Sequence, residues 1–388
     1  MSDRPIEERL RGPWRHLATL GLIAAVGALP HAAPVAAAET AVPGPPAWRP
    51  FDAGPDCRCA DGSEVHFHER VADPTRVVLY LEGGGACWSA ETCAFEGEEM
   101  TYIASSAWVA EMLPHRGGIF DASDPRNPLA GHTFVYVPYC TGDAQLGTVT
   151  RRYSDELTVE HKGFVNASAA LDHLVASYPD VTELIVAGVS AGSIPVPLFA
   201  GLAAERLPAA RIVALGDSSG GFPDDPMLNI AIGSLWGTAE TIPDWPATAD
   251  VDHEDWSIPA LTSYAGRHAP RITFARFDHA SDDVQAYYGR LAGAASRDIA
   301  AQLVANEAAI EAEGVVVASY VAPGDAHTIL GEDVFYDLEV EGVRLVDWVT
   351  ELIDGRTPAD VRCPECSAEV GVDATHPDQP LARVQQPA

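Results

Sequence analysis

Lysine is almost absent from this chain: Lys162 is the only one among 388 residues, and 24 basic residues stand against 56 acidic ones. The formal net charge of −32 disfavours nucleic acid and anionic membrane surfaces as partners, and it keeps the chain soluble. Long apolar runs are scarce as well, because no segment after residue 38 approaches the roughly 20 residues that a membrane-spanning helix needs. We therefore expect neither a nucleic-acid partner nor a membrane span.

The first 38 residues have the pattern of a secretory signal peptide. Four arginines precede the apolar run 17–29, and three alanines at 36–38 follow it. This order predicts cleavage near Ala38 and a mature chain that is secreted or periplasmic. Removing residues 1–38 takes away four basic and three acidic residues, so the net charge becomes −33. Residues 39–50 follow as a Pro-rich lead-in.

Seven cysteines in an exported chain predict disulfides, with one thiol left over. Cys87 and Cys93 are close enough in sequence to form a disulfide, and so are Cys363 and Cys366. The CPEC sequence of the second pair is also compatible with half of a zinc ribbon or with a redox pair, but a second CxxC is missing. Apart from such a disulfide, the Pro-rich tail 356–388 is expected to be poorly ordered.

Between these termini, apolar strand-like runs alternate with helix-like segments. This alternation predicts an α/β fold, with a mostly parallel central sheet, helices on both faces and a single catalytic domain over residues 51–355. The spacing of His66 and His68 on an early strand is that of metal ligands, but a lone HxH on an outer strand is typical of a solvated face. We predict no metal and no cofactor. The predicted strands cover residues 75–81, 132–138, 184–189, 210–215, 271–277 and 314–321.

The chemistry centres on Ser190, in the sequence Gly188-Val189-Ser190-Ala191-Gly192. A buried-type strand precedes this GxSxG pattern and a helix-like segment follows it, which is the context of a nucleophile elbow. The glycines allow strand and helix to pack closely while the serine adopts a strained conformation with its hydroxyl exposed. The alternative is a helix N-terminus that Ser190 merely caps.

Three consecutive glycines, at 83–85, follow the predicted strand 75–81. Backbone N–H groups in such a loop, together with the N–H of the residue after the nucleophile, form the oxyanion hole of α/β-hydrolases. The residue after Ser190 is Ala191. Gly84, Gly85 and Ala191 are therefore the candidate oxyanion donors.

A serine nucleophile needs a histidine base and a carboxylate that orients it, and in α/β-hydrolases they follow in the order Ser, acid, His. His327 lies just beyond the last predicted strand, where the histidine belongs. Asp282 is the preferred acid, Asp278 the second choice, and Asp217 a less usual acid one strand earlier.

A second GxSxG match occurs at residues 216–220, GDSSG, which is similar to the GDSGG of trypsin-like proteases. Those proteases are β-barrels in which the histidine and aspartate precede the serine. Here the segment runs into prolines rather than a helix, so we reject Ser218 as the nucleophile.

Seven motifs occur in order between about Cys57 and His327: LEGGGACW, GGIFDASDPRNPLAG, VYVPYCTGD, HKGFVNASAALDHL, GVSAGS, DDVQ and DAHTIL. Together they resemble the pectin acetylesterase/Notum family of exported serine hydrolases. The resemblance implies an α/β-hydrolase fold and a metal-free Ser-Asp-His triad. It implies the roles of Ser190 and His327, and it assigns the acid to Asp282, three residues before Gln285.

The family's oxyanion hole maps onto Gly84, Gly85 and Ala191. Notum-like members carry bulky residues where Gly85 and Ala86 stand, so their acyl specificity is not transferred. The leading hypothesis is an acetylesterase-like enzyme that removes acetyl or other short acyl groups from a carbohydrate or a small ester. The alternatives are a non-catalytic polysaccharide-binding relative, an esterase for longer acyl or polyester substrates and, on GDSSGG alone, an exported protease.

Overall fold

The computed structural model describes residues 47–364 and 366, apart from 98–99, 253–255, 295 and 297. The predicted signal peptide and most of the predicted tail lie outside the described residues. None of the described helices is long and apolar enough to cross a membrane.

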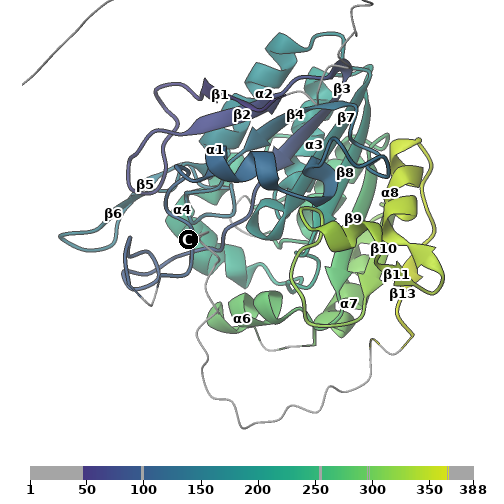
Figure 1. Ribbon diagram of the computed structural model, residues 1–388. Coiled ribbons are helices and arrows are strands. Elements are labelled where there is room, and N and C mark those ends of the chain that lie inside the picture. The colour runs from purple at the N-terminus through teal and green to yellow at the C-terminus, as the bar shows by residue number, and fades with distance from the viewer. Residues whose placement is uncertain are drawn as a thin grey trace, which may run out of the picture. The chain divides into compact units, whose positions relative to one another are not determined.

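A nine-stranded sheet organises the described chain, with strand order β1-β2-β4-β3-β7-β8-β9-β10-β13 (Figure 1). The pairs from β4 to β13 are parallel, whereas β1 and β2 add an antiparallel edge. This confirms the predicted α/β class with a mostly parallel sheet. The strands are β1 (Arg49–Asp52), β2 (His66–Arg70), β3 (Asp73–Leu81), β4 (His132–Val137), β7 (Glu183–Val189), β8 (Arg211–Asp217), β9 (Thr273–His279), β10 (Val317–Ala322) and β13 (Val361–Arg362).

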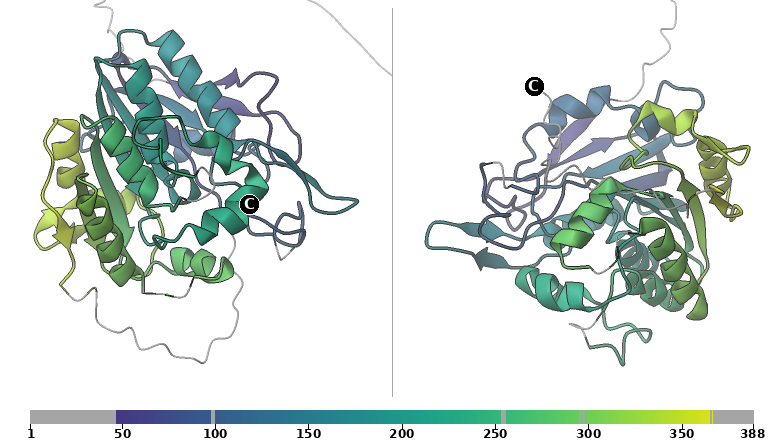
Figure 2. Two further views of the ribbon diagram at one scale, coloured as in Figure 1. Left: turned by 180° about the vertical axis from the view of Figure 1, so that it is seen from behind. Right: turned by 90° about the horizontal axis from the view of Figure 1, so that it is seen from below.

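Helices cover both faces of the sheet because successive strand residues point to opposite sides. On β3, Val77 and Leu79 join one apolar core with α2 and α3, while Val78 and Tyr80 join a second core with α1 and α8 (Figures 1 and 2). The helices are α1 (Val109–Met112), α2 (Gly163–Ser177), α3 (Val196–Arg206), α4 (Ser234–Trp236), α5 (Ala260–His268), α6 (Asp283–Leu291), α7 (Ile299–Ala312) and α8 (Leu345–Ile353). Two small hairpins, β5 (Thr150–Arg152) with β6 (Thr158–Glu160) and β11 (Glu339–Val340) with β12 (Val343–Arg344), lie outside the sheet.

The sheet extends beyond the predicted limits of 51–355 at both ends. Strand β1 starts at Arg49, inside the predicted lead-in, and β13 pairs with β10 through residues 361–362 of the predicted tail. The solvated face predicted for His68 is wrong. Strand β2 lies between β1 and β4, His68 is buried, and burial lowers the pKa of its imidazole to about 4.

Three disulfides are present among the described residues. Cys87–Cys93 and Cys363–Cys366 confirm the predicted pairs, and Cys59–Cys140 joins two segments that are 81 residues apart. Cys57 is the free thiol; it is buried, and burial raises its pKa to about 11. His161 lies near the sulfurs of Cys87 and Cys93, but their disulfide leaves no thiolate for a metal there.

Candidate active site

Ser190 sits on a tight turn between β7 and α3. Its φ is +52°, a left-handed conformation that costs a non-glycine residue free energy and often marks a functional site. A Cβ at Gly188 would lie 2.3 Å from the carbonyl oxygen of Gly192, and one at Gly192 would lie 2.3 Å from that of Leu81. Only glycine fits both positions, so the turn has the geometry predicted for a nucleophile elbow.

The loop of residues 82–88, here called the oxyanion loop, follows β3 and packs directly on this turn. A Cβ at Gly83 would lie 2.7 Å from the Cβ of Ser190, which places the loop backbone against the serine. Gly85 has φ +79°, and a Cβ there would lie 2.1 Å from the carbonyl oxygen of Thr101. The N–H of Ile103 donates to the Gly84 carbonyl at 2.8 Å, and the Tyr139 hydroxyl donates to the Gly85 carbonyl at 2.7 Å. These bonds fix the orientation of the peptide units that follow Gly84 and Gly85, and the first of these units carries the N–H of Gly85.

A buried ion pair that the sequence did not predict supports the same loop. The Glu82 carboxylate pairs with the Arg116 guanidinium and accepts from the Tyr136 hydroxyl at 2.5 Å and from the N–H of Gly83 at 3.1 Å. Because Arg116 lies 34 residues from Glu82, no local sequence pattern predicts the pair. The N–H of Gly83 is thereby occupied, so Gly83 serves packing while Gly84 and Gly85 remain the candidate donors of the loop.

Asp282 and His327 meet at the carboxyl end of the sheet, after β9 and β10. The His327 Nδ1 lies 2.8 Å from Asp282 Oδ2, and because a carboxylate only accepts, Nδ1 carries the proton. Asp282 is completely buried. Its Oδ1 accepts from the N–H groups of Val284 and Gln285 at 2.9 Å, so it caps α6, and the Gln285 amide donates to Oδ2 at 3.0 Å. The carboxylate is held from three directions.

The other ring nitrogen of His327 is left unbonded by the described residues. Its Nε2 is buried and has no hydrogen-bond partner in the described part of the chain. Ser190, Ala191, Gly85 and His327 line the same pocket. The structure thus brings together the serine, the histidine, the aspartate and the oxyanion loop that the sequence singled out.

The two alternative acids make their hydrogen bonds elsewhere. Asp217 Oδ2 accepts from the N–H groups of Ile329 and Leu330 at 2.8 and 2.9 Å. Asp278 Oδ1 accepts from the N–H of Gly220 and from the Gln285 amide, both at 3.0 Å. Asp278 is fully buried, and burial raises its pKa to about 6. In this geometry Asp282 is the only one of the three that orients the imidazole.

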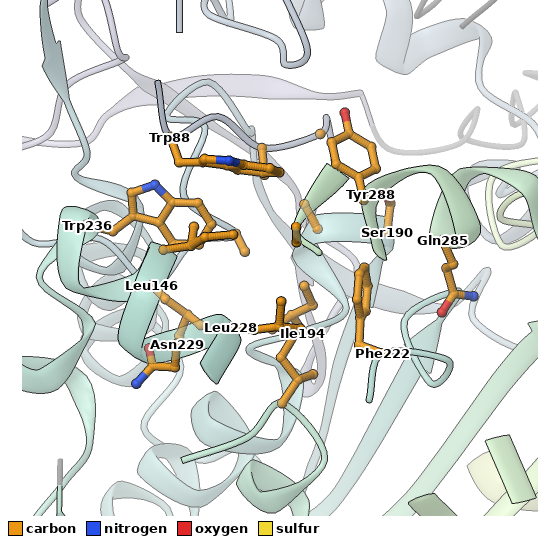
Figure 3. A pocket seen from close by; sticks show the side chains of 18 of the residues that line it. Trp88, Leu146, Ser190, Ile194, Phe222, Leu228, Asn229, Trp236, Gln285 and Tyr288 are labelled. Atoms are coloured by element: carbon orange, nitrogen blue, oxygen red, sulfur yellow. The ribbon is translucent and has the colours of Figure 1, made fainter. Parts of the chain in front are cut away.

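An apolar pocket opens beside Ser190 (Figure 3). The space between its walls, counted together with the open solvent at its mouth, is about 800 Å³. Trp236, Trp256 and Ile258 come from the segment 236–268, and the rest of this wall comes from the chain before it. The apolar lining consists mainly of Trp88, Leu146, Ile194, Phe222, Leu228, Ile232, Trp236, Trp256 and Ile258.

A second, wider cleft shares Gly85, Ser190 and His327 with the apolar pocket. Its walls carry charged side chains, in contrast to the pocket. Glu111, Glu332 and Asp333 are exposed there, and none of them forms an ion pair with another described residue. Ser190 and His327 therefore lie where an apolar pocket and an acidic cleft meet.

A family model described as Pectinacetylesterase matches residues 52–232. The match includes the oxyanion loop and Ser190 but ends before Asp282 and His327. Pectin acetylesterase 4 of Arabidopsis thaliana is 28% identical over 156 residues, which is 39% of this chain and 37% of that protein. Palmitoleoyl-protein carboxylesterase NOTUM of Homo sapiens is 27% identical over 168 residues, or 41% of this chain and 33% of that protein. The matches span about a third of the length of these relatives.

The fold comparison covers more of the chain. The structure of the Wnt deacylase Notum from Drosophila superposes with a TM-score of 0.56 at 18% identity, over 81% of this chain and 95% of that one. The shared architecture is the α/β-hydrolase fold. The family model and the distant relatives show that the chain belongs to the pectinacetylesterase/Notum family of carboxylesterases.

Proposed function

We propose that this chain is an exported carboxylic-ester hydrolase in which Ser190 is the nucleophile, His327 the general base and Asp282 the orienting acid. The observation that carries the proposal is the position of His327. Its Nδ1 is bonded to a buried carboxylate, its Nε2 has no partner among the described residues, and His327 lines the same pocket as Ser190. A histidine activates a serine hydroxyl when its Nδ1 is fixed by a carboxylate and its Nε2 is free to accept the hydroxyl proton.

In the proposed reaction, Ser190 Oγ attacks the ester carbonyl while His327 Nε2 takes the hydroxyl proton. The negative charge that develops on the carbonyl oxygen is stabilised by the N–H groups of Gly84, Gly85 and Ala191. His327 then returns the proton to the leaving alcohol, and an acyl group remains on Ser190. Water, activated by the same imidazole, releases the acid and restores the serine. Each step uses side chains and backbone amides, so no metal or cofactor is needed for the chemistry.

The proposed substrate is an acetyl or other short acyl ester of a carbohydrate. With a net charge of −32 and three unpaired carboxylates in the wider cleft, the protein repels a polyanionic carrier. A neutral or partly masked carbohydrate therefore fits the cleft better than a fully ionised pectin. The relatives' own substrates are not transferred, because their match covers only part of each chain.

The apolar pocket favours a second candidate, an esterase for longer acyl chains or polyesters. Three tryptophans and several aliphatic side chains line this pocket, which is more apolar wall than an acetyl group can contact. Ser190 lies at its edge, so an acyl chain attached to Ser190 can extend into it (Figure 3).

One experiment tests both candidates. The rate of hydrolysis is measured for p-nitrophenyl esters from acetate to palmitate, with Ser190→Ala as the control. A maximum of kcat/KM at acetate or butyrate supports the short-acyl proposal, and a maximum at longer chains supports the second candidate. If the wild-type protein cleaves none of these esters, the proposal fails and a non-catalytic carbohydrate-binding role replaces it. Acetylated pectin with methylated or free carboxyl groups then tests the carrier, and the methylated form should react faster.

Export is part of the proposal. The three disulfides favour an oxidising compartment, because such bonds rarely persist in the cytosol. The predicted signal peptide lies outside the described residues, so its test is the N-terminal sequence of the protein recovered from the medium or the periplasm. We expect that sequence to begin near Glu39.

A further inference from the structure

Residues 216–221, here called the GDSSGG segment, comprise the last two residues of β8 and the turn after it, and they have no part in the proposed chemistry. The segment lies at the carboxyl end of the sheet and is bonded both to the chain after His327 and to the chain around Asp282. Asp217 and Ser218 are both completely buried. Ser218 has φ +66°, so the backbone is held in a left-handed conformation at this point.

The side chains of the segment bind the backbone just after His327. The Ser218 hydroxyl accepts from the N–H of Thr328 at 3.0 Å and donates to Asp217 Oδ1 at 2.9 Å. Asp217 Oδ2 accepts from the next two N–H groups, those of Ile329 and Leu330. Three successive peptide units of the histidine loop are therefore fixed by two neighbouring side chains.

The backbone of the same segment binds residues on both sides of Asp282, in β9 and in α6. The N–H of Ser218 donates to the carbonyl of Phe277 at 2.8 Å, and the N–H of Gly220 donates to Asp278 Oδ1. The N–H of Gly221 donates to Gln285 Oε1 at 2.8 Å. This bond fixes the amide orientation of Gln285, so that its nitrogen donates to Asp282.

The segment also reaches the nucleophile elbow. The Ser219 hydroxyl lies 2.7 Å from the hydroxyl of Ser193, three residues after Ser190. The Ser193 N–H in turn donates to the Ser190 carbonyl at 2.9 Å. The GDSSGG segment is thus bonded to the chain beside each of the three residues of the proposed triad, Ser190, Asp282 and His327.

We propose that the GDSSGG segment is the positioning element of this active site, which sets His327 against Asp282 and Ser190. The inference rests on the proposed function, because it assigns the segment a role in that reaction. Asp217 and Ser218 act through the histidine loop and do not touch the substrate's reacting atoms. Because a displacement of about 1 Å in a catalytic group lowers the rate by about 100-fold, loosening the loop affects kcat before it affects substrate binding.

Ser218→Gly is the direct test, because glycine accepts the backbone conformation at φ +66° and only the hydroxyl is lost. We expect kcat for p-nitrophenyl butyrate to fall by about 10- to 100-fold with KM nearly unchanged. The rate at which diethyl p-nitrophenyl phosphate modifies Ser190 should fall by a similar factor. Asp217→Asn, which keeps the side-chain volume, is the second variant and should act in the same direction.

Ser319→Ala is the matched control. Ser319 is a completely buried serine on β10 whose hydroxyl bonds to Arg276 and Glu307 and to no residue of the proposed triad. Both Ser218→Gly and Ser319→Ala should lower Tm, but only the first should lower kcat per folded molecule. If Ser218→Gly keeps kcat within twofold of wild type, or if Ser319→Ala loses as much, the positioning role is refuted. Failure of the proposed function is a separate outcome, in which wild type and Ser190→Ala are equally inactive.

Discussion

Replacing Asp282 with asparagine should remove most of the activity while leaving the fold intact. In the structure the two carboxylate oxygens have separate tasks: Oδ1 caps α6, and Oδ2 accepts from His327 and Gln285. Asparagine is as good a helix cap as aspartate, so its oxygen can take over the bonds from Val284 and Gln285. Its amide nitrogen then faces His327, where the carboxylate oxygen stood.

A donor in that position changes the tautomer of the imidazole. His327 Nδ1 then becomes the acceptor and Nε2 carries the proton, so His327 cannot take the proton of Ser190. The same exchange in a serine protease triad lowers kcat by about 10⁴-fold, which corresponds to about 5.4 kcal/mol of transition-state stabilisation. We expect a loss of that order for Asp282→Asn, with KM changed little.

Asp283→Asn is the matched control, because it makes the same chemical change one residue further on, at an exposed position in the first turn of α6. Its kcat should stay within about twofold of wild type. The assay is the hydrolysis of p-nitrophenyl butyrate, with circular dichroism and Tm to confirm folding. The assignment is wrong if folded Asp282→Asn keeps kcat within tenfold of wild type. A loss of about 10⁴-fold in folded Asp278→Asn or Asp217→Asn, well beyond the roughly 10- to 100-fold loss expected of a positioning residue, would then identify the true acid.

Two further predictions concern stability and metals. The pKa of about 6 for buried Asp278, against 3.8 for an exposed aspartate, means that its neutral form stabilises the fold below about pH 4 and that this stabilisation is lost as the pH rises through 6. This pKa difference corresponds to about 3 kcal/mol of unfolding free energy. In urea unfolding, the stability of Asp278→Asn relative to wild type should therefore rise by that order between pH 4 and 7. A stability difference between the two proteins that stays constant with pH would contradict the burial argument. Dialysis against EDTA should leave kcat unchanged, because the proposed chemistry uses no metal. If EDTA inactivates the protein and a single divalent ion restores activity, His66 and His68 would have to be reconsidered as metal ligands.

The parts of the site that the sequence predicted all have a local signal. The GxSxG pattern between a strand and a helix located Ser190, and the glycines after β3 located the oxyanion loop. His327 followed from its place after the last long strand. Asp282 and Asp278 both follow the predicted strand 271–277. Asp282 was preferred there on position, and the resemblance of DDVQ to the family motif supported that choice.

The remaining features depend on contacts between distant segments. The Glu82–Arg116 pair and the Cys59–Cys140 disulfide join residues 34 and 81 positions apart, and neither has a pattern of its own. Strand β13 has two residues and follows a proline-containing loop, so its apolar signal is too short to read. The GDSSGG segment was recognised as a motif, but its bonds to three loops become visible only when those loops meet at one edge of the sheet.

Covalent labelling shows directly whether Ser190 is the nucleophile. The purified protein is treated with diethyl p-nitrophenyl phosphate, released p-nitrophenol is counted, and the modified peptide is identified by mass spectrometry. We predict one equivalent of p-nitrophenol and one diethylphosphoryl group, located on Ser190, with loss of ester hydrolysis in proportion. A label on Ser218, or full hydrolytic activity in Ser190→Ala, would contradict the claim.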